Sequence, residues 1–233
     1  MKKLAVITAR GGSKRIPRKN ILPFLGEPIL SYSIRAAIES GEFDEVMVST
    51  DDDEIAEIAL KYGAKVPFRR SEKTSNDFAG TADVLFEVID TYKELGQEFD
   101  VICCIYPTAP FVTADKLKKA MLKLTDSDAD TLIPVVRFSY PPQRALVMDG
   151  EYLAFEYPQY INSRSQDLTP HFHDAGQFYM MKIPAFIENG EIMKGKILPF
   201  ELSEMEVQDI DNFSDWQIAE IKYQAMQKEN GAK

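Results

Sequence analysis

Short apolar runs alternate with longer amphipathic segments over the first 136 positions of the chain. The apolar runs are typical of buried strands and lie at 4–7, 45–49, 101–105 and 131–136. The longer segments have apolar residues at helical spacing and predict helices at 29–40, 53–62, 81–95 and 113–124. Strands that alternate with helices in this way predict an α/β fold, with a mostly parallel sheet covered by helices on both faces.

The alternation stops after Val136. Residues 137–173 are rich in Pro, Tyr and Phe, with turn signals at 140–142 and 149–150 and one hairpin-strand pattern at 152–157. We interpret 137–173 as a small inserted lobe, and 1–136 with 174–233 as one core. The core pattern resumes with expected strands at 176–182 and 206–211 and a closing helix at 213–227, capped by Asn212 or Ser214.

Composition narrows the class of protein. The chain has 233 residues, of which 45% are hydrophobic and 27% charged, as in a globular domain. Its net charge of -10 argues against broad binding to nucleic acid or to an anionic membrane. No apolar stretch has the length of a membrane span, and the apolar run that starts the chain is too short for a secretory signal, so we expect a cytoplasmic protein. Cys103 and Cys104 point to opposite faces of an expected strand, which predicts two buried thiols and no disulfide between them.

The first 25 residues contain seven basic residues and no acidic residue. Five of the seven gather in the loop 10–20, directly after the first strand. Its glycines allow backbone N–H groups to approach phosphate oxygens, and Arg10, Lys14 and Lys19 would neutralise a triphosphate. The loop has neither the Walker A nor the dinucleotide-binding spacing. The alternative is a solvated basic turn, but the clustering and the position after a strand favour a phosphate site.

An acidic pair stands near the other end of the chain. Asp209 and Asp211 are two residues apart, so in a strand both face one side while Ile210 faces the core. Two carboxylates, with phosphate and water oxygens, suit Mg²⁺. The alternative is a polar strand end that precedes the last helix.

The loop also carries a family resemblance. Ala9-Arg10-Gly11-Gly12-Ser13-Lys14-Arg15-Ile16-Pro17-x-Lys19-Asn20 resembles the signature of the cytidylyltransferases that make CMP-activated nonulosonic acids, the CMP-sialic acid synthetase group. The resemblance implies a Rossmann-like nucleotidyltransferase, CTP as donor, Mg²⁺ as cofactor and a homodimer formed through the inserted lobe. It implies that Arg10, Lys14 and Lys19 are catalytic, and that the nucleotide also contacts Ala9, Gly11, Gly12, Ser13 and Asn20.

A second segment extends the resemblance. Arg70-x6-Asp77-x-Ala79-Gly80-Thr81 is similar to the part of these enzymes that recognises cytosine. The resemblance implies that Arg70 and Thr81 contact the base and that Ala79 lies against the nucleotide. The residues alone leave two alternatives, a surface charge at Arg70 and a helix cap at Thr81.

The acceptor half of the expected site departs from the sialic acid branch. Tyr106, in the segment 106–111, stands where those enzymes usually have Gln, and the segment 173–179 resembles the pseudaminic acid cytidylyltransferases. Arg164 is a candidate clamp for the acceptor carboxylate, since a guanidinium matches that group. The expected acceptor-binding residues are Tyr106, Arg164, His173, Gln177 and Tyr179.

The sequence thus predicts transfer of CMP from CTP to the anomeric hydroxyl of a nine-carbon sugar acid, with pseudaminic acid as the first choice. Activation of N-acetylneuraminic or legionaminic acid is the alternative within this enzyme class, and CMP-Kdo synthesis fits less well because that branch has a different loop. From another class, the chain could be a catalytically silent nucleotide-binding or scaffolding relative. The intact basic loop and both aspartates argue against that.

Overall fold

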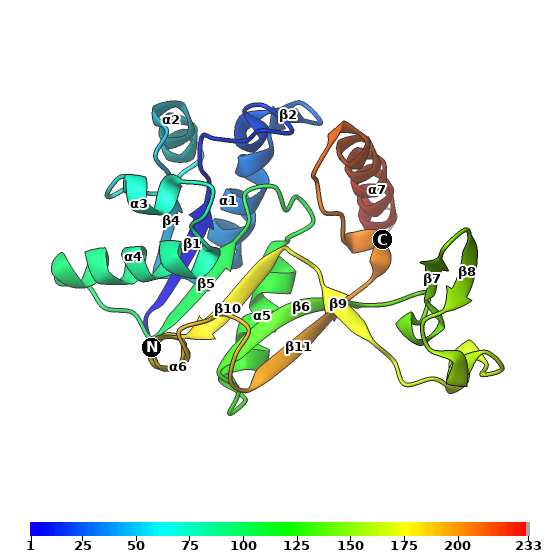
Figure 1. Ribbon diagram of the computed structural model, residues 1–233. Helices are drawn as coiled ribbons and strands as arrows, with labels where there is room; N and C mark the ends of the chain where they lie inside the picture. Colours follow the sequence, from blue (N-terminus) through cyan, green and yellow to red (C-terminus); the bar gives the residue numbers. More distant parts are fainter. Residues whose placement is uncertain (232–233) are drawn as a thin grey trace.

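The computed structural model describes residues 1–231, and the last two residues of the expected core, 232 and 233, lie outside the described residues. One sheet organises the molecule (Figure 1). Its main path contains, in spatial order, β11 (Ile197–Leu202), β6 (Thr131–Arg137), β10 (Phe178–Lys182), β5 (Val101–Ile105), β1 (Lys3–Thr8) and β4 (Glu45–Ser49), and β9 (Phe172–Asp174) pairs with β6. Five of these strands run one way, and β9 and β10 run the other way.

Helices cover both faces of the sheet because its central strands are apolar on both sides. On β1, Ala5 and Ile7 pack into one core cluster, and Leu4 and Val6 pack into the other. The first cluster includes side chains of α1 (Ile29–Ser40), α2 (Asp53–Lys61) and α5 (Ala114–Thr125). The second includes side chains of α4 (Thr81–Glu94) and α6 (Ile183–Asn189). The predicted fold class, a Rossmann-like α/β sheet with helices on both faces, is confirmed.

Cys103 and Cys104 fall on opposite faces of β5, one in each core cluster. Both are free and fully buried, as predicted, and burial raises the pKa of both thiols. They fill core space. Within residues 1–231, no helix is both long enough and apolar enough to cross a bilayer.

A third apolar cluster lies beyond the sheet and joins the two ends of the chain. Ile16 from the basic loop and Ile210 from between the two aspartates are each 1% exposed, and both pack in this cluster with Trp216. Trp216 belongs to the last helix, α7 (Phe213–Gly231). A two-stranded ribbon, β2 (Pro23–Phe24) with β3 (Glu27–Pro28), adds Phe24 to the same cluster. The basic loop and the acidic pair therefore share one small core.

The sequence prediction was wrong in two places at this end of the chain. Residues 207–210 have no regular structure and follow a short 3-10 helix, Glu204–Glu206, so the expected strand at 206–211 does not exist. The strand that completes the sheet is β11, which lies at its edge. Pro199 conceals β11 in the sequence, because proline is tolerated in a strand mainly at a sheet edge.

Smaller elements complete the chain. The short helix α3 (Glu72–Ser75) precedes α4 and was not predicted, and neither was α6. Of the two caps considered for the last helix, the side chain of Asn212 accepts a hydrogen bond from the backbone N–H of Asp215 at 3.1 Å. This is the hydrogen bond of a helix N-cap.

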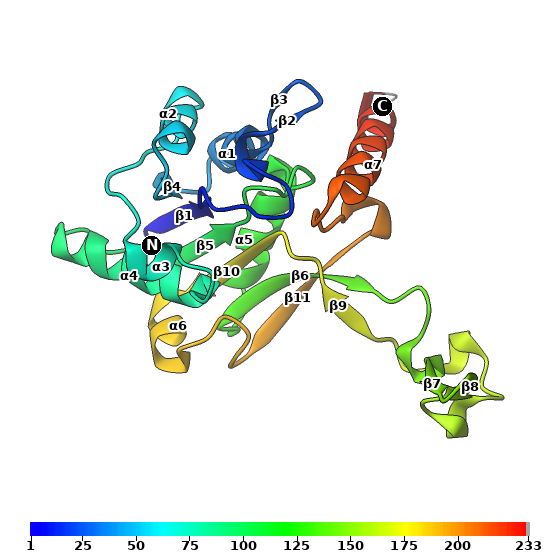
Figure 2. The same ribbon diagram turned by 45° about the horizontal axis from the view of Figure 1, so that its top comes forward.

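Between β6 and β9 the chain leaves the sheet. It forms a hairpin of β7 (Leu146–Asp149) and β8 (Tyr152–Phe155), together with short 3-10 turns. In both ribbon views this segment projects from the rest of the molecule (Figures 1 and 2). The hairpin strand predicted at 152–157 corresponds to β8.

Candidate functional site

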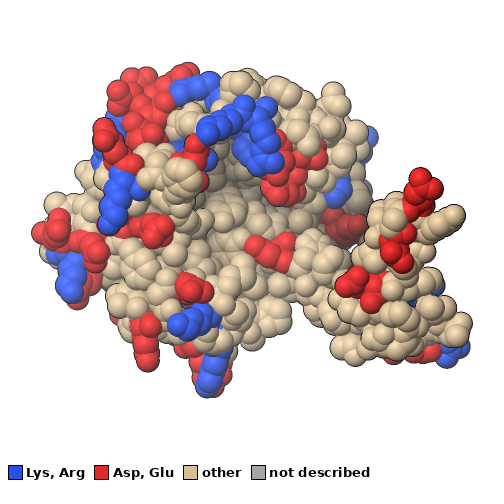
Figure 3. Space-filling view, in the orientation of Figure 1, with Lys and Arg blue, Asp and Glu red and all other residues tan. Residues whose placement is uncertain are grey.

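The loop that leaves β1 forms one wall of a cavity of about 590 Å³. In the space-filling view, Lys and Arg side chains gather beside a hollow in the core, with acidic side chains next to them (Figure 3). Most of the site residues expected from the sequence line this cavity, namely Arg10, Ser13, Lys14, Lys19, Asn20, Arg70, Ala79, Thr81, Tyr106, Asp209 and Asp211. Residues from both ends of the chain therefore meet in one space.

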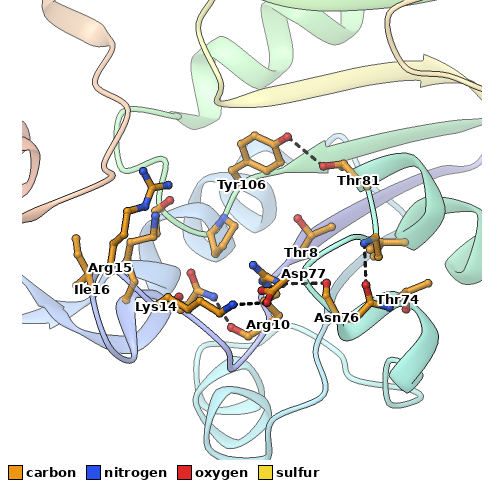
Figure 4. A pocket seen from close by; sticks show the side chains of 18 of the residues that line it. Thr8, Arg10, Lys14, Arg15, Ile16, Thr74, Asn76, Asp77, Thr81 and Tyr106 are labelled. Carbon is orange, nitrogen blue, oxygen red and sulfur yellow. Dashed lines mark hydrogen bonds and ion pairs between the residues drawn. The ribbon is translucent and has the colours of Figure 1, made fainter.

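Two cationic side chains of the loop form ion pairs with the same carboxylate, which belongs to another segment of the cavity lining. Asp77 forms ion pairs with Arg10, at 3.0 Å, and with Lys14 (Figure 4). The hydrogen bond from Lys14, aided by the charge of Arg10, lowers the pKa of Asp77. Arg10 also donates to the backbone carbonyl of Asn76 at 2.9 Å. Asp77 was not among the expected site residues, although it lies within the quoted 70–81 pattern.

Three expected loop residues support the loop and do not line the cavity. Ala9 is buried, and its N–H donates to the carbonyl of Ser49 at 3.0 Å. The N–H of Gly11 donates to Asp51 Oδ1 at 3.0 Å, and Gly12 is exposed. A Cβ on Gly11 would lie 2.8 Å from a carboxylate oxygen of Asp52, which explains why glycine suits this position.

The run Asp51–Glu54 does more than open a helix. Asp52 caps α2, accepting from the N–H of Ile55 at 3.0 Å, and it also holds the guanidinium of Arg18 through both carboxylate oxygens. Arg18 has a left-handed backbone, with φ of 58°, and its second partner is Glu54. The hydrogen bond from Arg18 lowers the pKa of Asp52. These ion pairs tie the basic loop to α2.

Arg70 and Thr81 lie on another side of the cavity. The Arg70 side chain is buried, with Nη2 donating to the carbonyl of Ser49 at 2.7 Å and Nε to its hydroxyl at 3.1 Å. Burial lowers the pKa of this guanidinium. The surface-charge alternative for Arg70 is therefore wrong. The cap alternative for Thr81 is also wrong, because Gly80 occupies the N-cap of α4 and the Thr81 hydroxyl lies 3.1 Å from that of Tyr106 (Figure 4).

The acidic pair approaches the loop directly. Lys19 Nζ donates to the carbonyl of Ile210 at 2.6 Å, and Arg15 Nη2 lies 2.6 Å from Asp211 Oδ1. Burial lowers the pKa of Lys19, while the charges of Asp211 and Asp209 oppose that shift. Although the segment is not a strand, Asp209 and Asp211 both line the cavity and Ile210 is buried. Over residues 1–231 there is no cluster of three or more metal-binding side chains.

A second cavity, of about 550 Å³, adjoins the first and shares Tyr106, Thr108 and Asp209 with it. His173 and Tyr179 line it, as does Asp174, which the sequence did not suggest. The Tyr179 hydroxyl donates to Asp174 Oδ2 at 2.5 Å, and burial raises the pKa of that hydroxyl.

Two expected acceptor residues do not line either cavity. Gln177 is buried in the core, where its Nε2 donates to the carbonyl of Glu206 at 2.6 Å. Arg164 belongs to the projecting segment, where its Nε pairs with Asp167 at 2.8 Å. The structure thus brings the nucleotide-side residues together and leaves Arg164 apart.

Comparisons with known proteins agree with this geometry. Residues 4–229 match the family model described as Cytidylyltransferase. The chain belongs to the cytidylyltransferase family. It is 45% identical over 224 residues to the pseudaminic acid cytidylyltransferase of Campylobacter jejuni serotype O:2, covering 96% of this chain and 97% of that protein. It is 32% identical to the CMP-N,N'-diacetyllegionaminic acid synthase of Legionella pneumophila, covering 94% of this chain and 95% of that protein. The resemblance stated from the motifs is confirmed.

Solved structures of this family's fold are similar as well. A CMP:2-keto-3-deoxy-manno-octonic acid synthetase complexed with CTP superposes with a TM-score of 0.70 at 18% identity, covering 98% of this chain and 100% of that chain. A 4-diphosphocytidyl-2C-methyl-D-erythritol synthase from Anaerococcus prevotii superposes with a TM-score of 0.66 at 15% identity, covering 96% and 98%. At these identities the likeness establishes the fold.

Proposed function

We propose that this cytidylyltransferase transfers CMP from CTP to the anomeric hydroxyl of a nonulosonic acid, pseudaminic acid in the first place, with release of pyrophosphate. The observation that carries the proposal is the single cavity in which the basic loop faces Asp209 and Asp211. A triphosphate needs cations on its oxygens, and two carboxylates opposite those cations can share a metal ion with it. The identity to pseudaminic acid cytidylyltransferases over nearly the whole chain supports the choice of acceptor.

The loop would act by position and charge. Arg10, Lys14 and Lys19 bind the phosphate oxygens, and the phosphates replace Asp77 as the partner of the first two cations. The acceptor hydroxyl oxygen attacks the α-phosphorus in line and loses its proton to solvent. The bond from that phosphorus to the bridging oxygen breaks, and pyrophosphate leaves with the bonding electrons. Cations held in place before the reaction stabilise this charge without reorganisation.

Mg²⁺ is the cofactor we propose, held by Asp209 and Asp211. The donor set fits, because the ion prefers oxygen ligands and usually takes one or two carboxylates, completing its shell with phosphate and water. The pair of Arg15 with Asp211 keeps that carboxylate turned toward the loop. When bound, the ion would neutralise phosphate charge and lower the pKa of the attacking hydroxyl.

Arg70 and Thr81 are the residues that we propose for reading cytosine. Arg70 is buried against Ser49, and Thr81 lies at the start of α4. Groups fixed in this way distinguish bases by donor and acceptor pattern, since a mismatched base leaves a buried polar group without a partner.

For the segment 137–173 we propose a role in forming a homodimer. Apolar side chains of its hairpin are exposed, among them Leu146, Met148, Tyr152 and Leu153. An exposed apolar patch of this kind is typical of a protein–protein interface. Sedimentation of the chain with and without residues 146–155 would test this proposal.

A pyrophosphate-release assay tests the proposed function. Each of the four nucleoside triphosphates is combined with pseudaminic, legionaminic and N-acetylneuraminic acids, with and without EDTA. The proposal expects turnover with CTP, highest for pseudaminic acid, and loss of turnover in EDTA. A preference for another acid would leave the reaction intact and change the acceptor. Calorimetric binding of CTP without turnover on any acid would point to a silent nucleotide-binding relative.

A further inference from the structure

Acidic side chains outnumber basic ones in the lining of the second cavity, although its proposed ligand is itself an acid. Asp174, Glu204 and Asp209 contribute carboxylates to its lining. Among the described residues, Lys222 of α7 is the lysine or arginine that lines it. An anionic sugar entering this space needs a cation nearby, because its carboxylate would otherwise face three like charges.

The ammonium group of Lys222 is positioned but not neutralised. Its Nζ donates to the carbonyl of Val207 at 2.8 Å and to that of Glu204 at 3.1 Å. Within residues 1–231, no ion pair joins Lys222 to a described carboxylate. An ammonium group has three N–H donors, so one remains for a ligand. Two carbonyl contacts thus hold a half-buried positive charge in place without cancelling it.

The position of Lys222 agrees with the chemistry of the acceptor. In the ring form of a 2-keto sugar acid, the carboxyl group and the anomeric hydroxyl are attached to the same carbon. When that hydroxyl approaches the nucleotide, the carboxylate must lie close to the boundary between the two cavities. Val207, which anchors Lys222, stands two residues before Asp209, and Asp209 lines both cavities.

Packing keeps this arrangement rigid. Trp216 and Ala219 on α7 pack in the same apolar cluster as Ile210, so the helix that carries Lys222 and the segment that carries the acidic pair are fixed together. A cation on such a rigid element loses little conformational freedom on binding.

We infer that Lys222 binds the carboxylate of the acceptor sugar acid. This inference rests on the proposed function and gives a cavity-lining residue the role that the sequence had suggested for Arg164. Arg164 does not line either cavity of this chain and is already paired with Asp167.

Steady-state kinetics of Lys222→Met and Lys222→Arg test the inference. Loss of a charge-assisted hydrogen bond predicts an acceptor KM about 10- to 100-fold higher in Lys222→Met, with the KM for CTP and the Mg²⁺ dependence unchanged. Lys222→Arg should recover part of the loss, because it keeps the charge. The matched control is Lys194→Met, since Lys194 Nζ also donates to a backbone carbonyl, that of Asn189 at 3.1 Å, in the turn after α6. It should behave as the wild type.

The methyl ester of the sugar acid separates charge recognition from structural support. The wild type should prefer the acid to the ester, and Lys222→Met should lose most of that preference. An equal loss on acid and ester, or an unchanged acceptor KM, would overturn the inference. So would a raised KM for CTP with a shifted Mg²⁺ titration, because that result would show that Lys222 only supports residues 204–207.

Two further outcomes keep this inference distinct from the proposed function. If Arg164→Met, and not Lys222→Met, lost the preference for the acid, the carboxylate site would lie on the projecting segment and the inference would be wrong. If the wild type turned over no sugar acid, the proposed function would fail. Calorimetry of acid binding to wild type and Lys222→Met would then decide the role of Lys222 independently.

Discussion

Replacing Ile16 by alanine tests whether the small core under the basic loop positions the nucleotide cations. Ile16 is 1% exposed and packs with Ile210 and Trp216, so the substitution removes three carbon atoms from a closed apolar cluster. Burial of each CH₂ group is worth about 0.8 kcal/mol, and the residual cavity adds to the loss. We expect the free energy of unfolding to fall by about 2–5 kcal/mol. For a chain of this size that corresponds to a decrease in Tm of roughly 4 to 20 °C.

The functional consequence distinguishes this site from an ordinary core position. With a smaller residue at 16, the loop loses apolar packing against the segment that holds the acidic pair, so the loop cations and the carboxylates are held less firmly in register. We expect the KM for CTP to rise about 10-fold, equivalent to about 1.4 kcal/mol of binding. Urea unfolding measures the stability, and pyrophosphate release under conditions where both proteins are folded measures the KM.

The matched control is Ile183→Ala. Ile183 is buried in the cluster under α4 and α6, away from the basic loop. It should lose stability by a similar mechanism and keep the KM for CTP. If both variants lost stability while neither changed that KM, the position of the loop would not depend on the Ile16 cluster and our reasoning would be refuted.

Three other predictions concern charged groups. Lys19→Ala should reduce turnover at least 100-fold while the circular dichroism spectrum stays native, because the variant loses a cation on the phosphates and a contact to the Ile210 carbonyl. Near-native turnover would show that Lys19 does not bind the phosphates. Asp211→Asn should raise the Mg²⁺ concentration needed for half-maximal activity about 10-fold or more, and an unchanged metal titration would contradict the ligand assignment. The lowered pKa of Asp52 means that its pair with Arg18 stabilises the fold above pH 4 and is lost as the pH falls through the folded-state pKa. Asp52→Asn should therefore flatten the decrease in unfolding free energy as the pH falls below about 4, measured by urea titration, whereas the exposed control Asp90→Asn should not.

The sequence by itself determined the class of fold and the family. Apolar runs and helical spacing located β1, β4, β5, β6 and the long helices to within a few residues. This worked because buried parallel strands are apolar on both faces and amphipathic helices have a strict period. The loop after β1 has a composition that a solvated turn does not explain, and its motif resembles the cytidylyltransferases, the family to which the chain belongs.

Elements with weaker local signals could not be predicted. The edge strand β11 contains a proline, and residues 207–210, which the sequence predicts as part of a strand, have no regular structure. Whether such a segment becomes a strand depends on its position at the sheet edge and on the residues that pack against it. A local sequence pattern contains neither kind of information. The prediction that Ile210 faces the core was still correct, because burial of an isoleucine does not require a strand.

The tertiary structure decided which residues share a site. From the sequence Arg70 resembles a surface charge, but in the fold Ser49 of β4 accepts hydrogen bonds from its guanidinium. Asp52 and Lys222 look like ordinary charges on helices, and only the fold sets them beside Arg18 and the carbonyl of Val207. Such pairings join different segments of the chain, and they form because the apolar clusters of the core hold those segments together.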